Sequence, residues 1–211
     1  MEGGTRTKST TRRPRSDGIR SRRAILREAA SLATVDGIEG LSLGRLAEAV
    51  GMSKSGLFAH FGSKEELQLA TIDTADRIYR EVVVDPAREA EPGTARLLAY
   101  TDRFLAHVRD GVFPGGCFFA SAAGELDTRP GPVRDRAMRS VNDWIELLVA
   151  EVSAAQEAGE VDPSLDPAQL AFELHAFMLL ANMQFIATGE EAPLGRARRA
   201  VESRLAAAAP G

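Results

Sequence analysis

Residues 41–61, LSLGRLAEAVGMSKSGLFAHF, constrain the fold of this 211-residue chain more than any other stretch. Apolar residues recur at spacings of three and four across 43–50, which predicts one buried face of a short helix. Gly51 can end that helix in a left-handed conformation, and a second short helix follows with Leu57 and Phe61 on its inner side. A helix of about 8 residues is about 12 Å long and suits the major groove of DNA, about 12 Å wide. The pattern predicts a helix-turn-helix with a DNA-reading second helix, although two short helices around a glycine also occur in purely structural bundles.

Serine residues mark the predicted helix starts in this region. Ser42 and Ser53 can each accept a hydrogen bond from a free backbone N–H, and Ser63 forms a capping box with Glu66. A further helical stripe at 25–37 ends in Asp-Gly turn chemistry. Three helices therefore precede residue 62, which is the minimum for a helix-turn-helix domain.

The first twenty residues are nearly free of apolar side chains and are rich in Gly, Ser, Thr and Arg. Because such a segment buries too little surface to offset chain entropy, 1–20 are expected to be a disordered basic arm rather than a signal peptide. Residues 1–64 hold 12 Lys or Arg against 6 Asp or Glu, whereas 65–211 hold 14 against 24. This asymmetry indicates a polyanion-binding domain beside an acidic partner domain, with a merely solvated basic tail as the alternative.

The stripe at 25–37, the motif at 41–61 and the sequence Ser-Lys-Glu-Glu-Leu at 63–67 together resemble the tetracycline-repressor (TetR) family of transcription regulators. The matching stretch runs from about residue 21 to about residue 70, and beyond it the resemblance is one of architecture only. It implies a helix-turn-helix DNA-binding domain over 21–66 and a helical effector-binding and dimerisation domain over 67–211.

The resemblance also implies which residues contact DNA. Lys54 and Ser55 would approach bases or phosphates, and Lys64 would contact a phosphate at the start of the next helix, unless it is simply a solvated residue. The family usually has Tyr where this chain has Phe58, so a hydroxyl that commonly bonds a phosphate is absent. His60 would face the DNA backbone, or is an ordinary exposed histidine. The candidate DNA-contacting residues are Ser42, Arg45, Ser53, Lys54, Ser55, Gly56, Phe58, His60 and Lys64.

The rest of the chain predicts helices and no strand, so the expected fold class is all-α. The expected helices lie at 63–84, 94–109, 117–126, 133–158, 167–188 and 195–208. The first of them starts in the DNA-binding domain and runs into the second domain, which makes it the expected mechanical link.

The helix expected at 167–188 is apolar nearly all round, because its only charged side chain is Glu173. Such a helix must be buried on more than one side. Its length also suits a membrane span, but its Gln, His and Asn residues argue against one. We expect one face to pack on its own domain and the other on a second subunit. With 195–208 it would form a two-fold symmetric four-helix homodimer interface.

The sequence contains no glycine-rich phosphate loop, no metal-ligand spacing and no nucleophile motif. We therefore expect no enzymatic activity, no metal and no cofactor. Cys117 is the only cysteine, which excludes an intramolecular disulfide and is consistent with the reducing cytoplasm. Its apolar surroundings predict a small buried hydrophobe, with redox sensing as the alternative.

The family resemblance implies an effector pocket among the middle helices of the second domain. The candidate lining is mostly aromatic with a few polar points: Phe104, His107, Phe113, Cys117, Phe118, Trp144, His175 and Met178. Such a lining favours a small apolar or aromatic effector, although each of these side chains is equally consistent with plain core packing.

These observations predict a cytoplasmic homodimer that regulates transcription by binding a palindromic operator in double-stranded DNA. The expected role is that of a repressor released by a small molecule. Effector binding would favour a conformer in which the helix at 63–84 sets the two recognition helices at the wrong separation. The alternative is a non-specific architectural DNA-binding protein that uses the arginine-rich arm.

Overall fold

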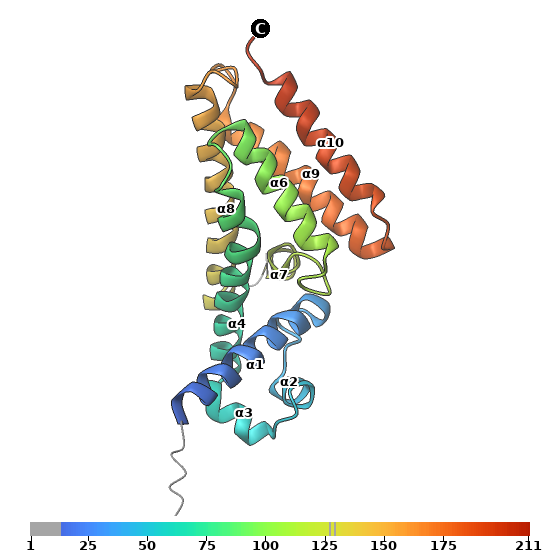
Figure 1. Cartoon of the computed structure of the whole chain (residues 1–211). Coiled ribbons are helices and arrows are strands. Elements are labelled where there is room, and N and C mark those ends of the chain that lie inside the picture. The colour runs from blue at the N-terminus through green and yellow to red at the C-terminus, as the bar shows by residue number, and fades with distance from the viewer. Residues whose placement is uncertain (1–13, 127, 129) are drawn as a thin grey trace, which may run out of the picture.

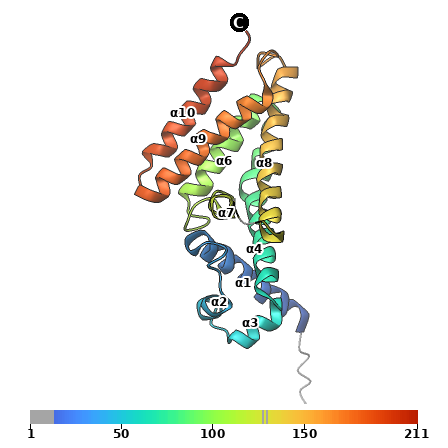
Figure 2. The ribbon, with the colours of Figure 1, turned by 180° about the vertical axis from the view of Figure 1, so that it is seen from behind.

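The computed structural model describes residues 14–126, 128 and 130–211, which contain helices but no strand. The predicted all-α fold is therefore confirmed. In chain order the elements are α1 (Pro14–Asp36), α2 (Leu43–Ala49), α3 (Lys54–Phe61), α4 (Lys64–Tyr79), the π-helical η1 (Arg80–Val84), α5 (Asp85–Ala87), α6 (Thr94–Arg109), α7 (Phe118–Leu126), α8 (Pro132–Glu157), α9 (Pro167–Thr188) and α10 (Ala192–Ala207). A small head of α1, α2 and α3 lies at one end of an elongated body formed by the remaining helices (Figures 1 and 2).

The head is a helix-turn-helix built as the serine and glycine positions predict. Ser42 accepts from the N–H of Arg45 at 3.2 Å, and Ser53 accepts from the N–H of Gly56 at 3.1 Å. Gly51 has φ +66°, the left-handed conformation expected after α2. The apolar sides of α1, α2 and α3 and the start of α4 meet in one buried cluster: Ile25, Leu26, Ala29, Leu41, Leu46, Ala47, Leu57, Phe61 and Leu67.

The first helix begins earlier than expected. Residues 14–20 belong to α1, so this part of the predicted disordered arm is helical. Residues 1–13 lie outside the described residues. A proline at the first helical position explains why α1 begins at Pro14, because the missing N–H would have had no helical partner there.

The link between head and body also continues further than the sequence suggested. The helix expected over 63–84 continues through η1 and α5 to Ala87, past Pro86. A proline ring inside a helix collides with the carbonyl four residues earlier, here that of Val82. The π-helical turn over Arg80–Val84 has a wider helical turn at that carbonyl, which makes room for the proline ring. The helix can therefore continue past Pro86.

The body holds a second, larger apolar core. The long helix α8 lies beside α4, and α9 runs between α6 and α10 in both views (Figures 1 and 2). Tyr79, Tyr100 and Trp144 pack edge to face near its centre, with ring centroids 5.4–5.5 Å apart. Such pairs add stability beyond their buried area.

Helix α9 keeps part of its apolar surface exposed. Phe172, Leu180 and Met183 are 67%, 51% and 60% exposed. Of the described helices, α9 is long and apolar enough to cross a membrane by length and composition, and 33% of its apolar window is buried inside the body. Two of its polar side chains are bonded to neighbouring segments: Glu173 pairs with Arg204, and Asn182 accepts a hydrogen bond from the N–H of Cys117 at 2.9 Å.

Candidate nucleic-acid interface and ligand cavity

The recognition helix α3 has one buried side and one open side. Leu57 and Phe61 are in the head core, whereas Lys54, Ser55 and Phe58 face outward. Phe58 is 51% exposed, an unusual position for a phenylalanine without a partner. The predicted split of the helix into an inner and an outer side is therefore present in the structure.

Two of the three serines predicted to contact DNA, Ser42 and Ser53, already act as helix caps. Besides its cap, the hydroxyl of Ser53 lies 3.2 Å from the hydroxyl of Ser55. Both caps are exposed at the start of their helices, where free N–H groups favour an anion such as a phosphate. Gly56 follows within the first turn of α3, where it supplies the N–H that Ser53 accepts.

The cations Arg45 and Lys64 are bonded to the head itself. Arg45 pairs with Asp36 at 2.8 Å, and Lys64 donates to the carbonyl of Glu39 at 2.6 Å. Their side chains remain 56% and 49% exposed. A phosphate at either position would therefore compete with a hydrogen bond or ion pair on the surface of the head.

Sequence reasoning missed one cation at the far end of the recognition helix. Arg22 donates to the carbonyl of His60 at 2.9 Å, and its guanidinium lies 4.7 Å from the centre of the Phe61 ring. A cation is favourable at the C-terminus of a helix, where carbonyls are unpaired. The basic pair Arg22-Arg23, just ahead of the buried residues Ile25 and Leu26 of α1, was the available signal.

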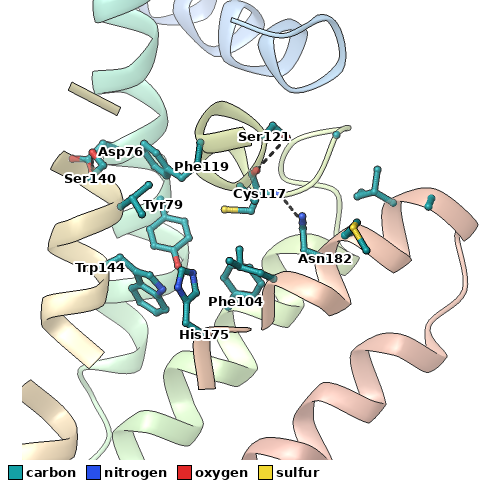
Figure 3. A pocket seen from close by; sticks show the side chains of 18 residues that line it. Asp76, Tyr79, Phe104, Cys117, Phe119, Ser121, Ser140, Trp144, His175 and Asn182 are labelled. Carbon is teal, nitrogen blue, oxygen red and sulfur yellow. Dashed lines mark hydrogen bonds between the residues drawn. The ribbon is translucent and has the colours of Figure 1, made fainter. Parts of the chain in front are cut away.

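A cavity of about 470 Å³ lies in the body between α4, α6, α7, α8 and α9 (Figure 3). This volume is in the usual range for small-molecule sites. Half of the predicted pocket residues line it: Phe104, Cys117, Trp144 and His175.

The other four predicted residues are buried in the core and do not line this cavity: His107, Phe113, Phe118 and Met178. Helix geometry explains the difference. On α9, His175, Leu179 and Asn182 face the cavity, whereas Met178 lies on the inner side with an exposed fraction of 1%. His107 is instead packed between the rings of Tyr79 and Phe113, with centroids 5.7 and 5.8 Å away.

The cavity also uses residues that the sequence did not single out. Tyr79 and Asp76 come from α4, Phe119 from α7, Ser140 from α8 and Met183 from α9. Tyr79 directly follows Ile78 in the apolar stripe of α4, and this adjacency to a core position was its only signal. Helix α4 thus contributes both to the head and to the cavity wall.

The cavity lining has little free charge. Its one carboxylate, Asp76, accepts from Ser140 at 2.9 Å and pairs with Arg80 at 3.1 Å and Arg136 at 3.6 Å. Burial lowers the pKa of His175 to about 4, so this imidazole is neutral at pH 7. Burial, and secondarily Cys117, raises the pKa of Tyr79 well above its usual value, so the phenol keeps its proton.

Cys117 is buried, and this burial raises the pKa of its thiol. The reactive form of cysteine is the thiolate, so a raised pKa disfavours oxidation chemistry. The packing agrees with the predicted small hydrophobe. Among the described residues, no group of three or more His, Cys, Asp or Glu side chains is arranged to hold a metal ion.

Polar contacts join the cavity wall to the head. Glu125 of α7 accepts from the N–H groups of Ile38 and Glu39 at 2.7 and 2.9 Å. The hydroxyl of Thr34 in α1 accepts from the N–H of Gly115, which also lines the cavity, at 3.0 Å. A Cβ on Gly115 would lie 2.0 Å from the carbonyl oxygen of Thr34, so only glycine allows this approach. The α1–α2 turn therefore rests on α7 and the loop before it.

Comparisons with known proteins identify the family. Residues 25–71 match the bacterial regulatory proteins of the tetR family, and residues 93–201 match the tetracyclin repressor-like C-terminal domain. This chain belongs to the TetR family. It is therefore a DNA-binding transcriptional regulator, in a family of regulators rather than enzymes, and the resemblance noted from the sequence is confirmed.

Individual TetR relatives agree over most of the chain. The HTH-type transcriptional regulator TcmR of Streptomyces glaucescens is 31% identical over 172 residues, which cover 77% of this chain and 74% of that protein. A TetR regulator from Chloroflexus aurantiacus has 27% identity and a TM-score of 0.84, with 90% of this chain and 96% of that chain covered. AibR, solved with isovaleryl coenzyme A and operator DNA, has 25% identity and a TM-score of 0.71, with coverages of 87% and 97%.

Proposed function

We propose that this TetR-family protein is a homodimeric repressor that binds a palindromic operator and is released by a small apolar or aromatic effector. The observation that carries the DNA part is the open side of α3, where Lys54, Ser55 and Phe58 lie outward over a well-packed head core. Phosphate contacts from the caps and from Arg22, Arg45 and Lys64 would fix the register on the duplex. Base contacts from the start of α3 would then supply sequence preference.

The exposed apolar side of α9 supports the homodimer. Phe172, Leu180 and Met183 recur along one side of the helix, and α10 packs beside it (Figure 1). Two such helix pairs make a four-helix interface of the kind that buries an apolar stripe. Because a two-fold dimer presents two recognition helices related by symmetry, its operator is expected to be a palindrome with half-sites about 34 Å apart.

The path of α4 supports release by an effector. Its N-terminus carries the cap Ser63 and the cation Lys64 beside the head, and its C-terminal turns place Asp76 and Tyr79 in the cavity wall. A ligand that displaces this wall would tilt α4 and change the separation of the two recognition helices. Effector and DNA would then weaken each other reciprocally. AibR, with its acyl-coenzyme A and operator, is a family member solved with both kinds of partner.

The single cysteine is buried as a thiol, and the proposed partner, DNA, lies in the aqueous interior of the cell. Both support a cytoplasmic location without membrane insertion. In that location α9 is covered by the second subunit rather than by lipid.

The decisive experiment is affinity selection of random DNA duplexes by the purified protein at about 150 mM salt, where weak phosphate attraction is partly screened. Enrichment of a two-fold symmetric site is the expected result. Lys54→Ala should lose that enrichment, whereas Lys64→Ala should weaken all duplexes alike. Enrichment of no sequence, with binding that disappears as salt rises, would support the architectural alternative instead.

A further inference from the structure

One end of the cavity in the body combines aromatic rings with an unpartnered hydroxyl. Tyr79 is 7% exposed and lines the cavity, yet its hydroxyl makes no hydrogen bond within the described part of the chain. Figure 3 shows the hydroxyl end of Tyr79 turned towards His175, beside Trp144. Because this hydroxyl has no protein partner among the described residues and is reached from the cavity, it is free to bond a ligand there.

The protonation states at this end are those of neutral hydrogen-bonding groups. Tyr79 keeps its proton at neutral pH because burial raises its pKa, and therefore it can donate. The His175 imidazole is neutral because burial lowers its pKa to about 4, so it offers one N–H donor and one acceptor nitrogen. Together the two side chains can hold an oxygen that accepts hydrogen bonds.

The cavity walls around Tyr79 and His175 favour a flat apolar ligand. Phe104, Phe119 and Trp144 line the same cavity. The Tyr79 ring meets the Trp144 ring edge to face at 5.4 Å and the Phe119 ring at 6.1 Å, which is a packed aromatic wall. Aromatic ligands gain from stacking and edge contacts with such rings.

The charges around the cavity disfavour an anion. Asp76 is the one charged side chain in the lining, and its ion pairs with Arg80 and Arg136 already occupy those two cations. A ligand carboxylate would have to leave water without a cationic partner in the lining, at a large desolvation cost.

We propose that this cavity binds an uncharged aromatic molecule with a carbonyl-type oxygen, which accepts hydrogen bonds from the Tyr79 hydroxyl and the His175 imidazole. The proposal rests on the proposed function, because it specifies the chemical class of the effector. It assigns Tyr79 as the specificity-determining residue, although its ring also belongs to the core.

The test uses three related compounds and one isosteric variant of the full-length protein. Benzophenone has two rings and a carbonyl, diphenylmethane has the same rings without the oxygen, and 4-benzoylbenzoate adds a negative charge. Tyr79→Phe removes the hydroxyl and keeps the ring. Affinities are measured by titration calorimetry at pH 7.5. Trp144 is the only tryptophan of the chain and lines the cavity, so its fluorescence locates the binding.

The wild-type protein should bind benzophenone about tenfold more tightly than diphenylmethane, as expected for two hydrogen bonds of modest net value. In Tyr79→Phe this preference should fall to about threefold, because the His175 N–H can still donate, while the affinity for diphenylmethane stays the same. 4-Benzoylbenzoate should bind at least about tenfold more weakly than benzophenone to both proteins. A variant that weakened both neutral compounds equally would show a packing role for Tyr79 and would overturn the assignment.

The proposal is also overturned if none of the compounds changes Trp144 fluorescence, or if 4-benzoylbenzoate binds most tightly. A separate titration of a labelled operator tests the proposed function. Compounds that bind as expected but leave operator affinity unchanged would confirm the ligand class and contradict effector control through this cavity. An operator selected by a protein that binds none of the compounds would support the regulator and contradict the ligand class.

Discussion

The head and the body of this regulator are both held together by buried apolar side chains, but their cores differ in kind. The head core is mainly aliphatic, with Phe61 as its one ring, and it serves to present α3 in a fixed orientation. The body core gathers Tyr79, Phe104, Phe119 and Trp144 around a cavity of about 470 Å³. The packed side chains of the head core make the head rigid, whereas the cavity in the body, with polar groups in its lining, offers a place for a ligand.

The junction between these two regions is largely polar. Glu125 holds the N–H groups of the α1–α2 turn, and Gln68 of α4 donates to the carbonyl of Ile38 at 2.9 Å. Directional bonds of this kind are lost when either partner moves by about an ångström, because hydrogen-bond geometry is narrow. A displacement of α7 or α4 by a ligand would therefore reach the head without disrupting its apolar core.

The largest effect is expected from removing a side chain at the centre of the head. Leu57 is fully buried, so Leu57→Ala should destabilise the head by about 2.7–5 kcal/mol. Operator binding should be lost while benzophenone binding in the body persists. Fluorescence anisotropy with a labelled operator measures the first activity, and calorimetry with benzophenone measures the second.

Leu148→Ala, at an equally buried position in the body, is the matched control and should impair ligand binding. Loss of both activities together in Leu57→Ala would mean that head and body unfold as one unit.

The second prediction concerns acid sensitivity of the body. His107 is 3% exposed, its ring nitrogens have no partner among the described residues, and burial lowers its pKa from 6.5 to about 4. Between these values the unfolded chain binds the proton and the folded chain does not, so stability falls as pH drops from 6.5 to 4. At about 1.4 kcal/mol per pKa unit, the loss approaches about 3 kcal/mol and is absent above pH 6.5.

His107→Phe keeps a ring between Tyr79 and Phe113 and should reduce that loss, measured as the free energy of unfolding in urea at pH 7.5 and pH 4.5. His175, whose pKa is also lowered to about 4, should leave some acid sensitivity in the variant. His60→Gln in the head serves as control. An acid response of His107→Phe equal to that of the wild type would show that His107 is not the group responsible.

The third prediction tests the junction itself. Glu125→Gln keeps the shape of the side chain, but only one of the two N–H groups keeps an oxygen acceptor, now a neutral one, and the other faces an NH2 donor. Because one charged hydrogen bond worth about 1.5–3 kcal/mol is lost and the other is weakened, the turn should loosen by about 2–4 kcal/mol. Hydrogen exchange of the N–H groups of Ile38 and Glu39 should accelerate about tenfold or more. Glu146→Gln, exposed on α8, should leave that exchange unchanged. Unchanged exchange in Glu125→Gln would remove Glu125 from the coupling.

The sequence predicted what depends on short-range chemistry. Ser42, Ser53 and Ser63 accept the expected N–H groups, and Gly51 ends its helix as expected, because capping involves only neighbouring residues. Apolar periodicity likewise placed Leu57 inside the head. These features follow from the order of residues within one or two turns of helix.

The cavity could be predicted only in part, since its lining depends on how five helices rotate against one another. An apolar residue of α9 such as Met178 has the same sequence signal as Met183, yet only Met183 faces the cavity. Likewise, Glu125 resembled any surface carboxylate, because its partners Ile38 and Glu39 lie far away in the sequence. Contacts between distant segments carry no local pattern.

The smallest effect is expected at Phe58, where the TetR family usually has tyrosine. Phe58 is 51% exposed on the open side of α3, so Phe58→Tyr adds a hydroxyl without disturbing the core. A new hydrogen bond to a phosphate should tighten operator binding by about threefold, within the usual net value of such a bond. Because phosphates carry no sequence information, a mutated operator should gain equally, and the ratio between the two affinities should not change.

Salt dependence separates this variant from the loss of a charge at a phosphate contact. Tyrosine is neutral and releases no counterion, so the slope of log affinity against log salt should stay that of the wild type. Lys64→Ala, at a proposed phosphate contact, should reduce the slope by about 0.9. A Phe58→Tyr protein with unchanged affinity would place residue 58 away from the DNA backbone, against the sugar or a thymine methyl group. Residue 58 would then contribute an apolar contact, and the polar contacts of α3 with the operator would come from Lys54 and Ser55.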